Sequence, residues 1–490
     1  MEVPLPTIGH LTGKRSIRVT EPLNVPAYLP RGKHLLIGQR RDLGSTDALI
    51  LLGKCAEHTG LRDMFDGNIW LDIRLPHVLF ICGKRGSGKS YDLGVLAEGL
   101  SLASSSNVTT KDTSVTTILF DTQNQFWSLG AAPSSKLPED HAQLVELEAW
   151  RIQPTPLDNV RLFAPKGDQA IVGTETEFVI SPTDIDADDW CGLLQVERYS
   201  PMGQCIRVVY RKVTSVGYSY QPSPHSSKEI QVPPKQNYEI LDLIECLRRD
   251  AEVTDQMQRP TRDAVLWRLE SLIDSKLFGE GGIDITDILV PGLMSVFLLR
   301  NLDDATKALV VSVVTKRIFK VMGEYHTRRK VARRFGEAPP DTNLPMGVWT
   351  IIDEAHVVCP AEQNTAAKPA LIEYVKRGRD AGLSLVLATQ QPSAIDSGVL
   401  SQVDLTIVHR LVLDSDIAAA ISRFPARFPS NVKLAERDVG DPRSLIRLLT
   451  AGEALVGDAE SERGFVIRIR PRVTAHAGDE PEVIEHDINP

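Results

Sequence analysis

One short segment constrains the fold of this chain more than any other. An apolar run, His77–Cys82, leads directly into Gly83-Lys84-Arg85-Gly86-Ser87-Gly88-Lys89-Ser90, which has the P-loop spacing G-x-x-x-x-G-K-S. In such a segment the glycines let backbone N–H groups surround an anion at the positive end of the next helix. The alternative, a glycine-rich surface turn, is disfavoured by the strand before it and the helix-compatible run Tyr91–Glu98 after it. The sequence therefore predicts a nucleoside triphosphate site at residues 83–90.

Two residues of this segment have specific expected roles. Lys89 would reach the β- and γ-phosphates, and the Ser90 hydroxyl would ligate Mg²⁺. ATP and Mg²⁺ are therefore the expected ligands.

A second apolar run, Gly347–Ile352, ends in two carboxylates, Asp353 and Glu354. Asp353 would hold the Mg²⁺ directly or through water, and Glu354 would polarise an attacking water. An Asp-Glu pair alone is weak, because helix N-termini also favour acidic residues. Together with a P-loop it predicts hydrolysis by water rather than transfer to a small-molecule acceptor.

A third apolar run, Leu383–Thr389, is followed by Gln390. An amide at the end of such a strand would sense the γ-phosphate or orient the water; the alternative is a turn residue with satisfied hydrogen bonds. Arg379 precedes this strand, and we expect its guanidinium beside the same edge, stabilising transition-state charge within or across subunits. The alternative for Arg379 is a surface ion pair with Asp380 or Glu373.

These segments together resemble a known family. WTIIDEAHVV, YVKRGRDAGLSLVLATQQPSAID and NIWLDIRLPHVLFICGKRGSGKS are similar to the HerA branch of the FtsK–HerA family of ring-forming motor ATPases, and the resemblance spans roughly residues 68–475. It implies a homo-hexamer that hydrolyses ATP between subunits and moves DNA, with double-stranded DNA favoured. It also implies a separate nuclease or other effector partner, in DNA processing or antiviral defence.

The chain departs from the family pattern at two positions. The resemblance assigns Asp121 to the nucleotide site, but Gln125 stands where the family commonly has Glu, and Gln391 stands where it has Arg. An alternative function is therefore an ATP-binding ring that serves as an assembly and regulatory platform for a defence effector without translocating DNA.

Charge leaves the nucleic-acid question open. The formal net charge is -9, so there is no global basic field. The main local basic feature ends a helix expected from near Asp304, and it is the candidate DNA contact: Arg328, Arg329, Lys330, Arg333 and Arg334. Basic residues at a helix C-terminus also complement the helix dipole, and charge runs are usually solvated faces.

The predicted fold is α/β, a RecA-like P-loop core with a mostly parallel sheet flanked by helices, a helical insertion and a small N-terminal module. The expected divisions are 1–67 for a β-rich or interface module, 68–174 and 281–475 for the core, 175–280 for the insertion and 476–490 for a tail. Six cysteines without a C-x-x-C pair indicate a reducing, cytoplasmic setting. No leader is evident, and no apolar run approaches the roughly 20 residues of a membrane span, so no membrane partner is expected.

Overall fold

The computed structural model describes most of the chain. The described residues are 5–11, 16–21, 23, 27–29, 33–38, 48–59, 63–110, 115–222, 228–340, 342–434, 437–459 and 463–477. The tail predicted at 476–490 therefore lies outside the described residues, except for its first two positions.

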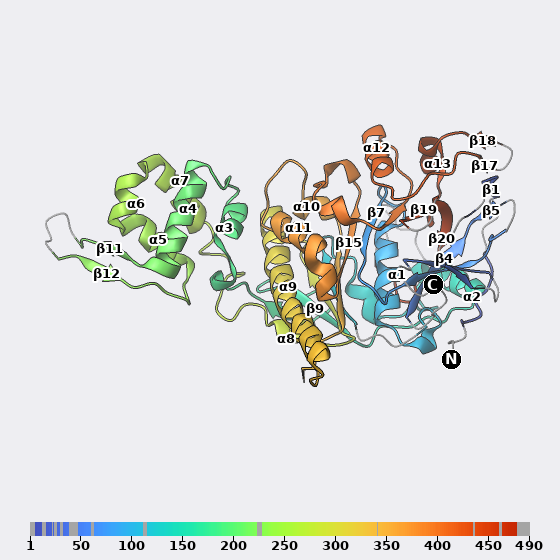
Figure 1. Ribbon diagram of the computed structural model, residues 1–490, viewed down its shortest axis with the longest axis horizontal. Coiled ribbons are helices and arrows are strands. Elements are labelled where there is room, and N and C mark those ends of the chain that lie inside the picture. The colour runs from blue at the N-terminus through green and yellow to red at the C-terminus, as the bar shows by residue number, and fades with distance from the viewer. Residues whose placement is uncertain are drawn as a thin grey trace, which may run out of the picture.

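One large sheet organises the described residues (Figure 1). Its strand order is β10-β9-β13-β8-β14-β15-β7-β16-β19-β20-β4-β6-β3-β2. From β10 to β16 neighbouring strands are parallel, and β19, β20 and β4 continue it antiparallel. The predicted mostly parallel, helix-flanked sheet is confirmed.

The strands of this sheet are β2 Ala27–Leu29, β3 His34–Ile37, β4 Leu49–Cys55, β6 Asn68–Asp72, β7 Val78–Cys82, β8 Val115–Asp121, β9 Val160–Pro165, β10 Thr176–Phe178, β13 Met294–Leu298, β14 Gly347–Ile352, β15 Leu383–Thr389, β16 Leu405–Val408, β19 Glu453–Asp458 and β20 Phe465–Ile469. The helices of eight or more residues outside the insertion are α1 Lys89–Ser101, α2 His141–Trp150, α9 Asp304–Phe335, α11 Ala367–Arg377 and α12 Asp414–Ser422. Shorter helices are α8 Ile285–Ile288, α10 Ala355–Val358 and α13 Pro442–Leu448.

Side chains alternate between two cores, one on each face of the sheet. On β7, Leu79 and Ile81 join the cluster that holds the buried residues of α1, whereas Phe80 and Cys82 join the cluster of α9 and α11. Both faces are covered by helices, which explains why the parallel strands are continuous apolar runs. Figure 1 shows α9, α10 and α11 on one side of β7 and β15, and α1 on the other.

A helical lobe stands at one end of the molecule (Figure 1). It contains α3 Ala187–Leu193, α4 Pro201–Arg211, α5 Ile240–Arg249, α6 Ala251–Gln256 and α7 Arg259–Glu270, with the hairpin β11 Tyr218–Tyr220 and β12 Ile230–Val232. The division of the chain at 175 and 280 remains a prediction.

The N-terminal strands continue the sheet of the core. β4 pairs with β6 on one side and with β20 on the other. A smaller sheet joins β1 Ile17–Val19 and β5 Glu57–Thr59 to β17 Val432–Leu434 and β18 Arg437–Val439. The module predicted for residues 1–67 remains a prediction, and its described strands share hydrogen bonds with residues beyond 67.

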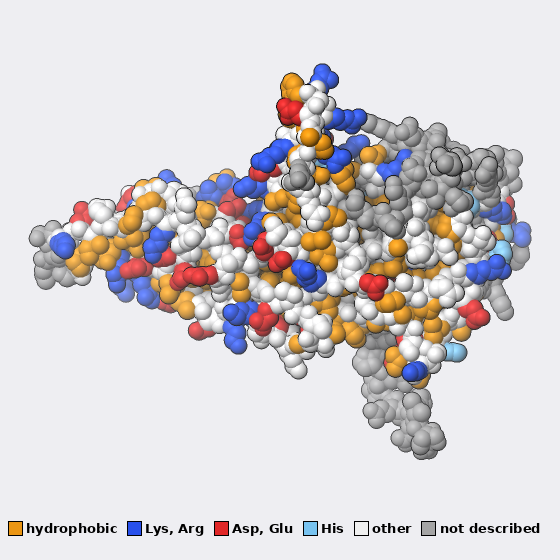
Figure 2. Space-filling model, turned by 90° about the horizontal axis from the view of Figure 1, so that it is seen from below, with side chains coloured by type: hydrophobic (Ala, Val, Ile, Leu, Met, Phe, Trp, Pro, Cys, Tyr) orange, Lys and Arg blue, Asp and Glu red, His pale blue; other side chains and the backbone are white. Residues whose placement is uncertain are grey.

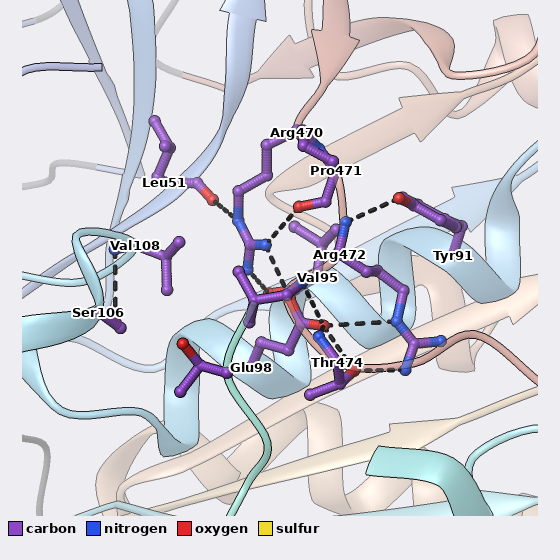
Figure 3. A network of polar contacts seen from close by, with 12 residues as sticks. Leu51, Tyr91, Val95, Glu98, Ser106, Val108, Arg470, Pro471, Arg472 and Thr474 are labelled. Atoms are coloured by element: carbon purple, nitrogen blue, oxygen red, sulfur yellow. Dashed lines mark hydrogen bonds and ion pairs between the residues drawn. The ribbon is translucent and has the colours of Figure 1, made fainter. Parts of the chain in front are cut away.

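A buried polar network fastens the end of the described chain to α1 (Figure 3). Glu98, on α1, is fully buried and lies 2.7 Å from the Arg470 guanidinium and 3.4 Å from that of Arg472. It also accepts hydrogen bonds from the amides of Val473 and Thr474. This network holds the segment after β20 against the P-loop helix.

No helix among the described residues has both the length and the apolar character needed to cross a membrane.

Candidate nucleotide-binding site

The P-loop connects β7 to α1, as the sequence predicts. Gly83 follows β7, and a Cβ there would lie 2.6 Å from the Cβ of His409. Gly88 has φ +116° and immediately precedes α1, a conformation that side-chain-bearing residues rarely adopt. Close packing therefore requires glycine at position 83, and backbone conformation requires it at position 88. The resulting loop places the first amides of α1 at the carboxyl edge of the sheet.

Lys89 is buried at the start of α1. Its Nζ donates to the carbonyl of Lys84 at 3.4 Å. Burial lowers the pKa of Lys89, and the carboxylates of Glu354 and Asp353 oppose that change. The ammonium group therefore faces the acidic pair, while Lys84 and Arg85 are exposed.

Asp353 lies at the end of β14 and is completely buried. Its Oδ1 accepts the N–H of Glu354 at 3.0 Å, and its Oδ2 has no hydrogen-bond partner. Burial raises the pKa of this carboxyl well above its ordinary value, and the nearby charges of Glu354 and Asp121 add to the rise. A buried carboxylate oxygen without a donor fits a Mg²⁺ ligand, with the Ser90 hydroxyl as the second expected ligand.

Glu354 has an uncommon backbone conformation and a well-anchored side chain. Its φ is +49°, in the left-handed region. Oε2 accepts the N–H of Gln390 at 3.1 Å and lies 3.3 Å from Nδ1 of His356; Oε1 is hydrogen-bonded to Nε2 of Gln390. Burial acts to raise the pKa of Glu354, but hydrogen bonds from His356 and Gln390 and the charge of Lys89 outweigh it, so the pKa is lowered. Glu354 is therefore held ionised, as a general base requires.

Asp121 ends β8, two strands from β15 on the same edge. It is fully buried, and its carboxylate accepts the amides of Gln123 and Phe126 at 3.1 and 2.8 Å. Burial raises the pKa of Asp121 to about 6. These bonds fix the loop after β8, while its role in nucleotide binding stays a prediction.

A cleft of about 310 Å³ opens beside the P-loop. It is lined by Lys84, Arg85, Gln390, Gln391, Ser393, Leu411, Val412, Leu413, Ser415 and Asp416. The loop after β16 and the start of α12 form its far wall, and the sequence contains no motif that identifies this wall.

The structure corrects the predicted position of Arg379. This residue lies in the short turn that precedes β15, whereas Gln390 follows the same strand. The two residues therefore occupy opposite edges of the sheet, so Arg379 is not beside the nucleotide edge of its own chain. Its side chain is exposed, and the neighbouring Asp380 pairs with Lys330.

The basic end of α9 lies at the same amino edge as Arg379. α9 is capped by Asp303, follows β13 and runs back to the start of β14. With 32 residues it is about 48 Å long, whereas a strand of six residues such as β14 is about 20 Å. The helix therefore extends past the sheet and carries its last turns into solvent.

Two histidines near the site were missed by the sequence reasoning. His409, after β16, is fully buried, its Nε2 lies 2.7 Å from a carboxylate oxygen of Asp92, and its ring packs against Gly88. His356 contacts Glu354 and lies 3.0 Å from Oγ1 of Thr389. His356 could have been considered, because it follows the acidic pair within the same short segment.

A family comparison decides the assignment. The family model described as "Helicase HerA, central domain" matches residues 68–318, just over half of the chain. The chain belongs to this HerA family. The predicted resemblance is therefore confirmed, and the match covers the P-loop, the helical lobe and the first part of α9, Asp304–Ile318.

Among curated relatives of this HerA-family chain, the "DNA double-strand break repair helicase HerA" of Sulfurisphaera tokodaii is 24% identical over 242 residues, 49% of this chain and 44% of the relative. That of Sulfolobus acidocaldarius is 25% identical over 167 residues, 34% and 32% of the two chains. The chain thus spans less than half the length of these relatives. Among solved structures, VirB4 of Thermoanaerobacter pseudethanolicus is similar with a TM-score of 0.48 and 15% identity, covering 86% of this chain and 96% of VirB4.

Proposed function

We propose that this protein is an ATP-hydrolysing DNA translocase of HerA type. The observation that carries the proposal is the carboxyl edge of the sheet, where Lys89, the acidic pair and Gln390 converge from three different segments. Curated relatives named as DNA double-strand break repair helicases support the DNA part of the proposal.

The side chains divide the chemistry between them. The P-loop amides and Lys89 bind the phosphates, and Ser90 and Asp353 would hold Mg²⁺, whose charge offsets that of the phosphates. Glu354, held ionised, accepts a proton from the attacking water, and the amide of Gln390 lies within reach of both Glu354 and the cleft.

Two substitutions separate binding from hydrolysis. Lys89→Ala removes the buried ammonium group and should abolish nucleotide binding. Glu354→Gln keeps the shape but not the base, so it should bind ATP and retain it without turnover, a loss of about 10²- to 10⁴-fold in kcat. Fluorescent-nucleotide titration and phosphate release measure the two steps, and full hydrolysis by the Glu354→Gln protein would refute its role as base.

The proposed assembly is a homo-hexamer in the cytoplasm with ATP between subunits. Arg379 then acts only across an interface, because the amino edge of one subunit would have to meet the carboxyl edge of the next. A separate nuclease or effector completes the proposal, in DNA processing or antiviral defence. The platform alternative, without DNA movement, is favoured only by Gln125, Gln391 and the net charge of -9.

The proposed DNA contact is the projecting end of α9. Its basic residues are Arg328, Arg329, Lys330, Arg333 and Arg334, of which only Lys330 has a carboxylate partner recorded among the described residues. Lys376, Arg377 and Arg379 add positive charge nearby, opposed by Glu373 and Asp380. Figure 2 views the molecule from below, the side to which α9 runs in Figure 1, and shows Lys and Arg side chains on and around a projection at its upper edge. This surface fits a phosphate backbone, which needs charge rather than base-specific contacts.

Replacing Arg328, Arg333 and Arg334 together by Ala tests this surface. We expect weaker duplex binding and a salt dependence whose log–log slope is smaller by about 1 per lost phosphate contact. The matched control replaces Arg198, Arg259 and Arg268 on the helical lobe, an equal change in charge. Equal effects of the two triple variants would refute α9 as the specific contact.

A further inference from the structure

His356 contacts Glu354 but is not one of the residues proposed to bind phosphate. It belongs to α10, the four-residue helix directly after Glu354. Its Nδ1 lies 3.0 Å from Oγ1 of Thr389, the last residue of β15, and 3.3 Å from Oε2 of Glu354. The imidazole therefore bridges the ends of two neighbouring parallel strands, β14 and β15.

The same oxygen of Thr389 also accepts the N–H of Gln391 at 2.9 Å. The Thr389 hydroxyl is thus fixed by the backbone of β15, and it in turn fixes the imidazole. The ring is mostly buried, with a side chain 20% exposed. Rotation of His356 away from Glu354 would break the contact to Thr389 as well.

The contacts leave little acceptor capacity on the Glu354 carboxylate. A carboxylate offers about four lone-pair positions. Oε2 accepts the N–H of Gln390 and lies 3.3 Å from Nδ1 of His356, a nitrogen that carries at most one proton and also contacts Oγ1 of Thr389; Oε1 accepts from Nε2 of Gln390. One position on Oε1 remains, and it is the position available for the proton of a water.

Glu354 also needs external support for its backbone. A non-glycine residue with φ +49° is held there only where the surrounding contacts determine it, and such residues cluster at active sites. The side-chain contacts to Gln390 and His356 add to two hydrogen bonds of the Glu354 backbone, from its N–H to Oδ1 of Asp353 and from the N–H of Val357 to its carbonyl.

We propose that His356 is a positioning residue for Glu354: it holds the carboxylate, together with Gln390, so that a single acceptor position of Oε1 faces the water. The inference rests on the proposed ATP hydrolysis and deepens it. His356 acts through Glu354 and does not itself touch the nucleotide.

The test compares substitutions at His356 with steady-state ATP hydrolysis and fluorescent-nucleotide affinity as paired readouts. His356→Ala should lower kcat about 10- to 100-fold, the size of effect that a misplaced reacting group produces, with KM and nucleotide affinity unchanged. His356→Asn keeps a donor at the position of Nδ1 and should restore most of kcat, whereas His356→Gln, whose donor lies one bond further, and His356→Leu should not. His141→Ala, an exposed histidine on α2, is the control and should match wild type.

The outcomes separate this inference from the proposed function. If His356→Ala turns over ATP as fast as wild type, the positioning role alone is overturned. The same holds if His356→Asn and His356→Leu lose kcat equally. Absence of turnover in wild type would overturn the proposed hydrolysis and the positioning role with it. Nucleotide affinity retained by each variant shows that the site is still folded.

Discussion

The surroundings of Asp353 destabilise its charged form in the nucleotide-free protein. It is completely buried, it is close to two other carboxylates, and its Oδ2 has no donor. Burial and these neighbours raise its pKa, so the charged form destabilises the fold until a cation is bound. Functional residues commonly lower stability in this way.

Asp353→Asn should therefore raise the stability of the nucleotide-free protein while abolishing Mg²⁺-dependent hydrolysis. Because the pKa is raised in the folded state, wild type loses stability as the pH rises from the unfolded value near 4. We expect the Asn variant to be about 1–2 kcal/mol more stable at pH 8 and the difference to vanish toward pH 4. Urea titrations at both pH values check this, and an Asn variant less stable at pH 8 would contradict it.

Local spacing was enough to predict where the candidate site residues lie on the sheet, because each motif is continuous in the chain. Lys89 and Ser90 follow β7 directly, and Asp353 and Glu354 follow β14. The contact of His356 with Thr389 could not be predicted, since it depends on which strands are neighbours. The predicted position of Arg379 is wrong because this residue precedes β15 and therefore lies at the amino end of that strand, not at its carboxyl end.

Among the elements, α1 is secured from both ends. Its N-terminus carries the P-loop, and its last turns hold the Glu98 network with Arg470 and Arg472 (Figure 3). Gly94 makes the approach possible, because a Cβ there would lie 2.6 Å from the Arg472 guanidinium carbon. The segment after β20 thus stabilises the helix that follows the P-loop.

Glu98→Ala should cost about 3–5 kcal/mol of the free energy of unfolding, because it leaves two buried guanidinium groups without their carboxylate. Glu146→Ala is the matched control: Glu146 also pairs with an arginine, Arg468, but both side chains are partly exposed, so its loss should cost at most about 1 kcal/mol. Urea unfolding of the two variants gives the comparison. Losses of equal size would contradict the account of the network.

The sequence predicts that α9 is a helix, but it does not predict how far the helix extends beyond the sheet. Its start near Asp304 is visible in the sequence, and the structure confirms it. That its basic end extends past the sheet follows only from the lengths of α9 and β14 together.

At the scale of the whole molecule, the parallel core was predictable and its extension was not. Continuous apolar runs between helices indicate a parallel sheet covered on both faces. β4 pairs with β20, which joins residues near 54 to residues near 468. Nothing in the sequence of either strand indicates that the other is its partner. The whole molecule consequently has the candidate nucleotide-binding groups on one edge of its sheet and a basic projection on the other.

If the proposed function is right, these two edges are coupled: ATP hydrolysis at one responds to DNA at the other. The most direct measurement is the steady-state ATPase activity of the purified, sized oligomer with and without duplex DNA, with Lys89→Ala as the blank. The account predicts strong stimulation by DNA that the triple variant of Arg328, Arg333 and Arg334 lacks. Turnover in wild type that is indifferent to DNA, or no turnover at all, would contradict the translocase and favour the platform.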